Sequence, residues 1–420
     1  MSSQPRVGLY LFNKDLRLDD LPGLIKLNLD VDQLILVYFD EPWILEANAF
    51  GLISQGPHRR RFIYQGLHDL NQQLFRLGQQ LIVKKANIAT GLPALCKQFG
   101  VSRIGYSLDV APYEARHIDA VRQALPQVSW ETNTSNHLFD EAQLPSDPCT
   151  MKNTFTPWRK QIEASIEPVK PVDKPTSLKP PVPGIYSDIE LQTPSHVHHW
   201  QGGETAGLEQ LQYYFWKTQF VSQYKETRNG MEGWDYSSKF SAWLASGMLS
   251  PRRVANELFT YEQDIEQNDS TYWLYFELLW REFFHWQLVK HQHVLFAAEG
   301  FKGNQAFGEF DAQRFARWCE GKTGCEIVDA GMRELQQTGF MSNRARQLCA
   351  SYFIHELNLH WRYGAAWFEQ QLIDYDVASN WGNWLYLAGG GSDPRGQRKF
   401  NMQKQTDMYD SDGQFRRAWL

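Results

Sequence analysis

The chain has 420 residues, of which 42% are hydrophobic and 21% charged, and its formal net charge is −6. This composition is ordinary for a globular protein of two or three domains. The acidity excludes binding of nucleic acid by overall charge, so any such site must be a local basic patch. The longest wholly apolar run, residues 34–39, excludes a membrane span, which needs roughly 18 residues. The five cysteines form no CxxC pair and the chain begins without a secretion signal, so we expect a reduced, cytoplasmic monomer.

The first 135 residues alternate short β-rich runs with longer amphipathic stretches. The β-rich runs are residues 7–12, 33–39, 80–85, 103–108 and 127–132. Between the second and third runs, residues 59–77 place apolar side chains at spacings of three and four, which is typical of an amphipathic helix. Strand and helix in repetition predict a doubly wound, mainly parallel α/β sheet over residues 1–135.

The second part of the chain is predicted to be helical. Ten of the 19 prolines lie between Pro145 and Pro194, which predicts an interdomain linker over residues 136–200. We expect residues 201–420 to form an all-α domain. Long helical periodicity occurs at residues 208–224, 270–289 and 347–372.

Several patterns suggest chemistry that their surroundings do not support. The GKT at residues 321–323 lacks the preceding glycine of a phosphate-binding loop, because residue 316 is alanine. His196, His198 and His199 lie beside the proline-rich segment without cysteine or acidic partners, so we interpret them as solvated linker and expect no metal. The chain contains no GxSxG, which leaves a hydrolase nucleophile without support.

A cluster of hydroxyl groups and one cation precedes a predicted helix. The cluster consists of Ser237, Ser238, Lys239 and Ser241. Free backbone N–H groups, hydroxyls and a cation at a helix N-terminus suit an anion such as a diphosphate. The alternative is an ordinary serine N-cap.

Two further segments place charges among aromatic residues. Glu277 and Arg281 are one helical turn apart beside Trp280, which predicts a partly buried ion pair facing a ligand cavity; the alternative is a surface pair. Asp374 and Asp376 precede an aromatic run, and two carboxylates there need a partner such as an N–H-rich ring or a buried arginine. With the anion site, these features fit a flavin dinucleotide. We expect it in the helical domain, because no GxGxxG follows the first strand.

The ordered set of motifs resembles the photolyase and cryptochrome family, and within it the DASH-type cryptochromes. The similarity spans nearly the whole chain. The motifs are DLR at 15–17, GGETAGL at 202–208, TRNGMEGWDYSSKFSAWLASGMLSPR at 227–252, ELLWREFF at 277–284, GKTGCEIVDAGMRELQQTGFMSNRARQ at 321–347 and DYDVASNWGNW at 374–384.

This resemblance implies an FAD folded into a U shape within the helical domain. The cofactor-binding positions that it implies are Tyr224, Ser237, Ser238, Lys239, Phe240, Ser241, Arg281, Asn343, Asp374, Asp376 and Asn380. Asn380 stands at the position that faces the reactive ring nitrogen N5, where plant signalling cryptochromes usually have aspartate. This difference favours the repair side of the family.

The resemblance also implies a chain of tryptophans that reduces the flavin. Trp384 and Trp361 match its two inner members. The outer member falls near Gly308, with only Phe307 and Phe310 beside it. Because phenylalanine is a poor redox relay, the route by which the electron reaches the surface is left open.

A pocket for a flipped pyrimidine dimer is implied as well. The positions that line or rim it are Glu277, Trp280, Asn343, Arg344, Gln347, Tyr386 and Arg398. Gln347 and Tyr386 stand where repair enzymes of double-stranded DNA usually have methionine and tryptophan, which is the DASH pattern associated with single strands. A pocket that holds the dimer less tightly cannot offset duplex opening, which costs on the order of a few kcal/mol.

The sequence therefore predicts a deoxyribodipyrimidine photo-lyase of DASH type. Excited reduced FAD would donate an electron to a cyclobutane pyrimidine dimer, preferentially in single-stranded DNA; Glu277 would stabilise the dimer radical anion and Trp280 would offer a stacking face. The alternative is a blue-light sensor that binds FAD and signals through a partner, because fold does not fix function. Relatives often hold 5,10-methenyltetrahydrofolate as an antenna between the two domains, and the altered residues near Asn13 leave this open here.

Overall fold

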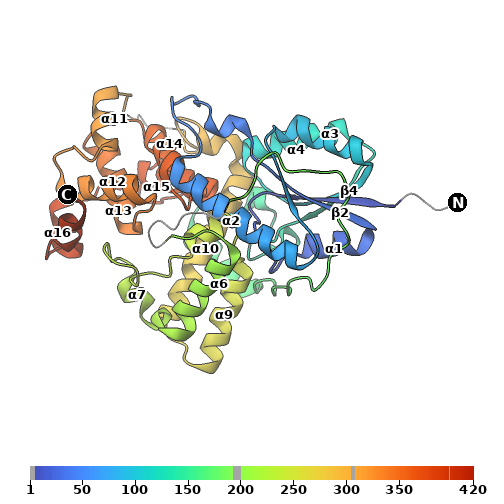
Figure 1. Ribbon diagram of the computed structural model, residues 1–420. Coiled ribbons are helices and arrows are strands. Elements are labelled where there is room, and N and C mark those ends of the chain that lie inside the picture. The colour runs from blue at the N-terminus through green and yellow to red at the C-terminus, as the bar shows by residue number, and fades with distance from the viewer. Residues whose placement is uncertain (1–4, 193–199, 304–307, 397) are drawn as a thin grey trace.

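The chain forms an α/β part and a helical part that lie side by side (Figure 1) in the computed structural model, which describes residues 5–192, 200–303, 308–396 and 398–420. The sheet lies at one end of the molecule, and the last helices, α16 (Met402–Tyr409) and α17 (Gln414–Trp419), lie at the opposite end. This arrangement confirms the predicted fold class.

The sheet of the α/β part has five parallel strands in the order β3-β2-β1-β4-β5. They are β1 (Val7–Phe12), β2 (Gln33–Phe39), β3 (Leu81–Lys84), β4 (Val101–Ser107) and β5 (Ser129–Asn133). The predicted β-rich runs match these five strands, because each run combines apolar and β-branched residues with polar turn residues at both ends.

Helices cover both faces of the sheet. They are α1 (Pro22–Asp30), α2 (Pro57–Arg76), α3 (Ile88–Phe99) and α4 (Pro112–Ala124). Val7, Leu9 and Leu11 of β1 share a core with α3 and α4, whereas Tyr10 and Phe12 belong to the core that α1 and α2 cover. Successive side chains of a strand point to opposite faces, so β1 is buried along its whole length.

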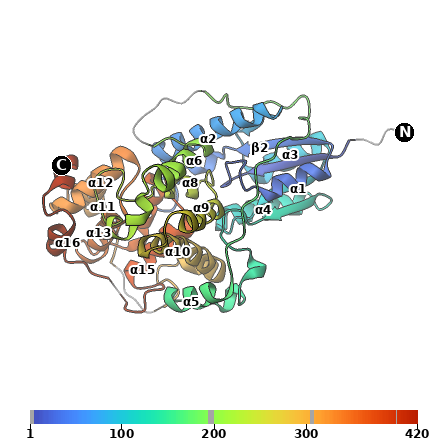
Figure 2. The ribbon, with the colours of Figure 1, turned by 90° about the horizontal axis from the view of Figure 1, so that it is seen from below.

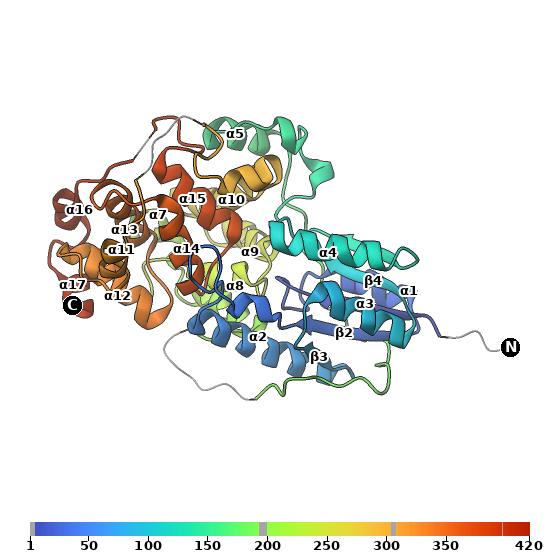
Figure 3. The same cartoon turned by 90° about the horizontal axis from the view of Figure 1, so that it is seen from above.

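The segment predicted as a linker contains a helix, α5 (Phe155–Ser165). This helix lies on the outside of the helical part, against α10 (Asp269–His291), and buries Trp158 (Figures 2 and 3). The following residues, 166–192, form neither helix nor strand but run back along the sheet, where the Leu34 N–H donates to the Pro180 carbonyl oxygen at 3.0 Å. The proline-rich chain is therefore packed against the α/β part.

The rest of the described chain is almost entirely helical, and none of its helices is both long and apolar enough to cross a membrane. Besides α10, α16 and α17, the helices are α6 (Glu204–Gln212), α7 (Tyr224–Thr227), α8 (Ser241–Ala245), α9 (Pro251–Asp264), α11 (Ala312–Cys319), α12 (Glu326–Thr338), α13 (Asn343–His355), α14 (Trp361–Gln371) and α15 (Val377–Ala388).

Two of the three periodic runs do not form single α-helices. In the run 208–224, α6 continues as a π-helical turn at residues 213–217, and the helix is then interrupted at Gln219, whose φ is +56°, before a 3-10 turn at residues 220–223. The run 347–372 breaks between α13 and α14, where Asn358 has a φ of +49°. Asparagine tolerates this left-handed conformation, and a helix does not continue through it.

A buried arginine joins the two parts of the molecule. Arg17 is 0% exposed. Its guanidinium donates five hydrogen bonds, to the carbonyl oxygens of Asp19, Asp20, Ser135 and Gly247 and to the side-chain oxygen of Asn136. Gly247 belongs to the helical part and approaches so closely that an added Cβ would lie 1.7 Å from the Lys14 carbonyl oxygen. All five donors of the guanidinium are satisfied, so the charge is buried without a lost hydrogen bond.

The substitution Arg17→Lys should destabilise the whole chain. Lysine offers three donors from one point and leaves buried carbonyl oxygens without partners, so the free energy of unfolding should fall by about 3 kcal/mol. Urea denaturation followed by circular dichroism measures the loss. The control Arg76→Lys, at an exposed position of α2, should change stability by less than about 0.5 kcal/mol; equal effects of the two substitutions would contradict the role of Arg17.

Candidate functional site

Two cavities bear on the predicted site residues, and the larger of them lies among α13, α14 and α15 and has a volume of about 140 Å³. Apolar walls from Phe368, Leu372 and Leu387 surround several polar groups, the usual composition of a ligand site. Eight residues singled out in the sequence line it. They are Asn343, Gln347, Asp374, Asp376, Asn380, Trp384, Tyr386 and Arg398.

Helix α15 brings three of these side chains together. Asp376, Asn380 and Trp384 are spaced by four residues, and this spacing places them on one face of the helix. Asp376 begins the helix as its N-cap and accepts the Ser379 N–H at 2.8 Å. The Asn380 side-chain amide donates to the Ala365 carbonyl oxygen of α14 at 3.0 Å, which fixes its orientation.

Each of the two neighbouring carboxylates, Asp374 and Asp376, is stabilised by its own arginine. Both oxygens of Asp374 accept hydrogen bonds from Arg346 of α13, at 2.8 and 3.0 Å, which confirms the expected arginine partner. Burial alone would raise the pKa of Asp376, but the attraction of Arg281 and the N–H of Ser379 hold that pKa below its usual value. Asp376 therefore presents negative charge at the cavity, and Arg346 holds the Asp374 side chain there.

Of the two predicted redox tryptophans, Trp384 lines the larger cavity and Trp361 begins the neighbouring helix α14. Trp384 and Trp361 are both nearly fully buried. Trp384 packs on Gly364, one helical turn beyond Trp361 in α14, so closely that an added Cβ would lie 2.2 Å from the Trp384 ring. At the predicted outer position, Gly308 is described, whereas Phe307 lies outside the described residues.

The rim of the cavity is a set of interlocked polar side chains. The Arg344 guanidinium donates to the Gln347 side-chain oxygen at 3.0 Å and to that of Asn229 at 2.9 Å. Arg398 donates to the Tyr386 hydroxyl at 2.6 Å and pairs with the buried Asp393. These arginines are thus held in place before any ligand binds.

Trp280 adjoins this rim. Its ring stacks on Phe155 of α5 at 3.8 Å between centroids and meets the edge of Tyr386 at 5.9 Å. Two neighbours on different elements fix the indole, and Phe155 is a contact that lies in the segment predicted as linker. Sequence periodicity gave no sign of it.

The predicted ion pair between Glu277 and Arg281 is wrong. Glu277 pairs with Arg228 at 2.7 Å, whereas Arg281 donates to the Asn136 carbonyl oxygen at 2.7 Å. Of the two cavities, Arg281 lines the smaller and Glu277 lines neither. Burial raises the pKa of Glu277, although the attraction of Arg228 opposes this rise. Tertiary partners have replaced the pairing that helical spacing suggests.

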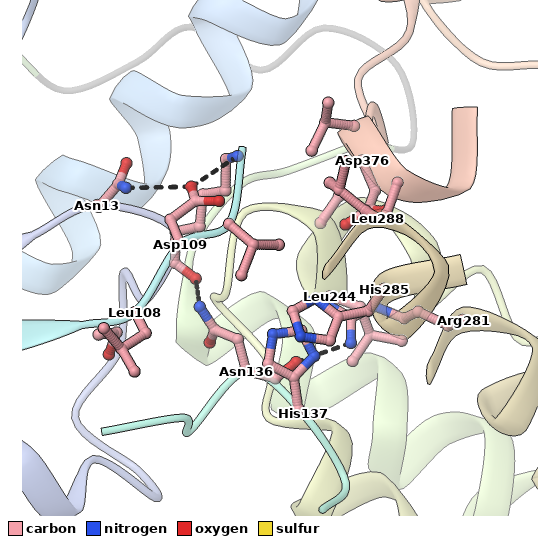
Figure 4. A pocket seen from close by; sticks show the side chains of 16 residues that line it. Asn13, Leu108, Asp109, Asn136, His137, Leu244, Arg281, His285, Leu288 and Asp376 are labelled. Atoms are coloured by element: carbon pink, nitrogen blue, oxygen red, sulfur yellow. Dashed lines mark hydrogen bonds and ion pairs between the residues drawn. The ribbon is translucent and has the colours of Figure 1, made fainter. Parts of the chain in front are cut away.

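The smaller cavity lies between the α/β part and the helical part (Figure 4). Its volume of about 30 Å³ is enough for about two water molecules. Asn13 and Asp109 face Arg281 and Asp376 across it. Asp376 lines both cavities, so the two adjoin at this residue. The smaller, polar cavity lies on the α/β side of the larger one.

A stacked pair of histidines lines the smaller cavity. The rings of His137 and His285 lie 3.5 Å apart between centroids. Burial lowers the pKa of His137 to about 3 and that of His285 well below its usual value. Both imidazoles are therefore uncharged at neutral pH, and the formal charges at this cavity are those of carboxylates, Lys14 and Arg281.

The residues predicted to form an anion site do not lie at either cavity. None of its residues lines either cavity: Ser237 and Ser238 precede α8, Ser241 begins this five-residue helix, and Phe240 is buried. The Lys239 ammonium lies 3.2 Å from the centroid of the Tyr236 ring. Burial lowers the pKa of Lys239 to about 7, so this cation is only partly charged near neutral pH. Tyr224, at the start of α7, is buried as well.

Two functional candidates were missed in the sequence, Arg346 and Arg228. Arg346 lines the larger cavity, and Arg228 holds Glu277. The need of Asp374 for a buried arginine was a readable signal, but it did not indicate which arginine. No cluster of three or more potential metal ligands occurs among the described residues. The triplet His196, His198 and His199 lies outside them.

Comparison with known proteins places the two parts in one family. Residues 8–178 match the family model for DNA photolyase, and residues 273–420 match that for the FAD binding domain of DNA photolyase. The chain is 41% identical over 418 residues to cryptochrome DASH of Idiomarina loihiensis, covering 99% of this chain and 92% of that protein. It is also 41% identical over 420 residues to cryptochrome DASH of Vibrio parahaemolyticus, covering 99% and 93%.

Solved structures agree with these matches. The cryptochrome from Synechocystis sp. PCC6803 superimposes with a TM-score of 0.94 at 40% identity, covering 100% of this chain and 89% of that one. A bacterial class III photolyase from Agrobacterium tumefaciens superimposes with a TM-score of 0.84 at 27% identity, covering 100% and 87%.

A double-mutant cycle should expose the charge balance at the larger cavity. Arg346→Gln leaves the Asp374 carboxylate buried without its cation, so the free energy of unfolding should fall by about 3 kcal/mol. Adding Asp374→Asn removes the stranded charge, and the double variant should regain much of that loss. Urea denaturation of the four proteins measures the coupling. Additive losses would show that the two side chains act independently.

Proposed function

We propose that this chain, which belongs to the photolyase and cryptochrome family and within it to the DASH cryptochromes, is a repair enzyme. It repairs cyclobutane pyrimidine dimers with blue light and FAD. The preferred substrate is single-stranded DNA. The observation that carries the proposal is the cavity in which Asn380, Trp384 and the Arg346–Asp374 pair lie together.

The side chains around this cavity fit the polar edge of a flavin ring. Arg346 offers N–H donors, Asp374 and Asp376 offer carboxylate acceptors, and the Asn380 amide offers both. When bound, FAD supplies light absorption and the transferred electron. The proposed cofactor-binding residues are those expected from the sequence, namely Tyr224, residues 237–241, Arg281, Asn343, Asp374, Asp376 and Asn380, with Arg346 added.

The chain's own groups would hold the reacting molecules and balance their charge. The bond from Asn380 to Ala365 keeps the amide aimed at one position, and Trp384 forms the wall behind it. Glu277 would accept a hydrogen bond from the flipped dimer, sharing its carboxylate with Arg228. Trp280, held by its stack on Phe155, would offer a flat face to a base.

The polar residues at the rim of the larger cavity support the preference for single-stranded DNA. Gln347 and Tyr386 line the cavity as polar groups, and each is tied to an arginine, Arg344 or Arg398. A polar, hydrogen-bonded wall gives a flipped dimer less apolar contact than a methionine and a tryptophan would. Less binding energy is then available to open a duplex, and this favours strands that are already unpaired. The folate antenna, the monomeric state and the cytoplasmic location stay predictions.

Oligonucleotide repair under blue light tests the function. With chemically reduced protein, dimers in a single strand should be split at least about tenfold faster than the same dimers in a duplex, since roughly 1.4 kcal/mol of opening cost corresponds to tenfold. Glu277→Gln should slow splitting while it leaves binding to undamaged strands intact. No splitting of either substrate would favour the alternative of a blue-light sensor, and equal rates would contradict the strand preference.

Cofactor content tests the assignment of Arg281. Arg281→Ala removes the main cation that stabilises the Asp376 carboxylate, which keeps only its hydrogen bonds to Ser379 and the weaker attraction of Lys14, so the purified variant should lose most of its FAD. The ratio of flavin to protein absorbance measures the loss. Arg281→Lys, which keeps the charge, should retain more cofactor; full FAD content in the alanine variant would contradict the assignment.

A further inference from the structure

The path by which an electron could leave the cavity region is continuous beyond the two inner tryptophans. Trp361 meets the edge of Trp381 with ring centroids 5.8 Å apart. Trp381 directly follows Asn380 in α15 and packs against Phe50 and Phe296. Trp361 therefore contacts a further indole beyond the two inner members of the chain.

The predicted outer position cannot hold a redox-active side chain with this backbone. A Cβ added at Gly308 would lie 1.8 Å from the carbonyl oxygen of Asn358, and the adjacent Glu309 bridges to Leu359. Phe310 stacks on Tyr363 and is 46% exposed. Position 308 itself thus offers packed backbone, and the aromatic residues nearest to it are Phe310 and, beyond it, Tyr363.

Trp381 instead ends in a hydrogen-bonded cluster of three residues. Its indole N–H donates to the Oε2 atom of Glu369 at 3.1 Å and lies 3.2 Å from the hydroxyl of Tyr375. The Tyr375 hydroxyl donates to the same Oε2 atom at 2.9 Å. One carboxylate oxygen therefore faces two side chains that can each give up an electron and a proton.

Charge around the cluster distinguishes the two possible donors. The Arg59 guanidinium lies over the Tyr375 ring, 4.6 Å from its centroid, and a cation there opposes electron loss from the phenol. Burial and the Glu369 carboxylate also raise the pKa of Tyr375 well above its usual value. No such cation–ring contact occurs for Trp381 among the described residues. Electron loss is favoured at the indole.

We propose that Trp381 is the terminal aromatic electron donor of this chain and that Glu369 accepts its indole proton; the inference rests on the proposed flavin photochemistry. With FAD bound and photoexcited, Trp384 would give up one electron to it, Trp361 would refill Trp384, and Trp381 would refill Trp361. The oxidised indole then transfers its Nε1 proton to the Glu369 carboxylate, which leaves a neutral indole radical and a carboxylic acid. A thiol reductant in solution, as thiolate, later returns one electron, and the proton returns from Glu369 to Nε1.

The proton transfer explains why the electron would not simply return. An indole radical cation is a strong acid, and a carboxylate already hydrogen-bonded to its N–H accepts the proton without rearrangement. Recombination must then move the proton back as well as the electron. Tyr375 and Arg59 act as positioning residues, because they hold the carboxylate side chain and its backbone through the Tyr375 hydroxyl and the Glu369 carbonyl oxygen.

Transient absorption and electron paramagnetic resonance after a blue flash test the proposal on the FAD-containing protein. The wild type should form a long-lived neutral indole radical. Trp381→Phe should lose it, and Glu369→Gln, which keeps the size but not the basicity, should shorten its lifetime by about a hundredfold, the scale of a removed proton acceptor. The control Tyr363→Phe, in the same aromatic neighbourhood, should behave as the wild type. An unchanged neutral radical in Trp381→Phe or Glu369→Gln would overturn the assignment.

A second measurement separates this inference from the proposed function. When the flavin is reduced chemically before illumination, dimer splitting needs no electron from Trp381, so Glu369→Gln should split dimers at the wild-type rate. If every variant forms the expected radicals but none splits dimers, the proposed repair function fails and the relay stands. If dimers are split normally and the radical is indifferent to residues 369 and 381, the relay fails and the repair function stands.

Discussion

The buried guanidinium of Arg17 sets the geometry on which the functional site depends. Its five hydrogen bonds fix the backbone of the α/β loops against Gly247 of the helical part, and one of them holds the Asn136 side chain. The carbonyl oxygen of the same Asn136 accepts the Arg281 guanidinium, which lies beside Asp376 at the start of α15. The desolvated charge of Arg17, where the two parts meet, is thus connected through Asn136 and Arg281 to the helix that carries the site residues.

Close approach of two backbone segments makes this contact between the α/β part and the helical part possible. Gly247 has a φ of +66° and has no room for a side chain beside Lys14, so only glycine fits there. From the other side, both carboxylate oxygens of Glu204 accept backbone N–H groups, from Leu18 at 2.9 Å and Asp19 at 2.7 Å. This contact satisfies its polar groups with backbone partners, which a sequence pattern does not reveal.

Sequence reasoning succeeded where one element alone determines the outcome. The β-rich runs located the five strands, because each strand is set by the residues of its own short run. It failed where a second element competes: Glu277 and Arg281 have the spacing of a helical pair but bind Arg228 and Asn136 instead.

The missed features have the same physical origin. Apolar periodicity continues through the break at Asn358, so the sequence pattern carries no sign of the left-handed turn that separates α13 from α14. Likewise, Arg346 and Arg344 both stand at the start of α13 and are equal as sequence letters. Only the fold turns one toward Asp374 and the other toward Gln347.

The arginine bound to Tyr386 changes how the rim residues are understood. The resemblance contrasts Tyr386 with a tryptophan at this position, and in the structure the Tyr386 hydroxyl accepts a hydrogen bond from Arg398, which also pairs with the buried Asp393. A tryptophan at residue 386 would add apolar surface and at the same time remove this hydrogen-bond acceptor. Arg398 would then be held by Asp393 alone. Ring size and the freedom of Arg398 to reach a phosphate therefore change together at this position. Under the proposed repair function, a polar residue at 386 would limit apolar contact with a flipped base and would also restrain one of the cations at the cavity rim, and both effects would reduce the energy available for opening a duplex.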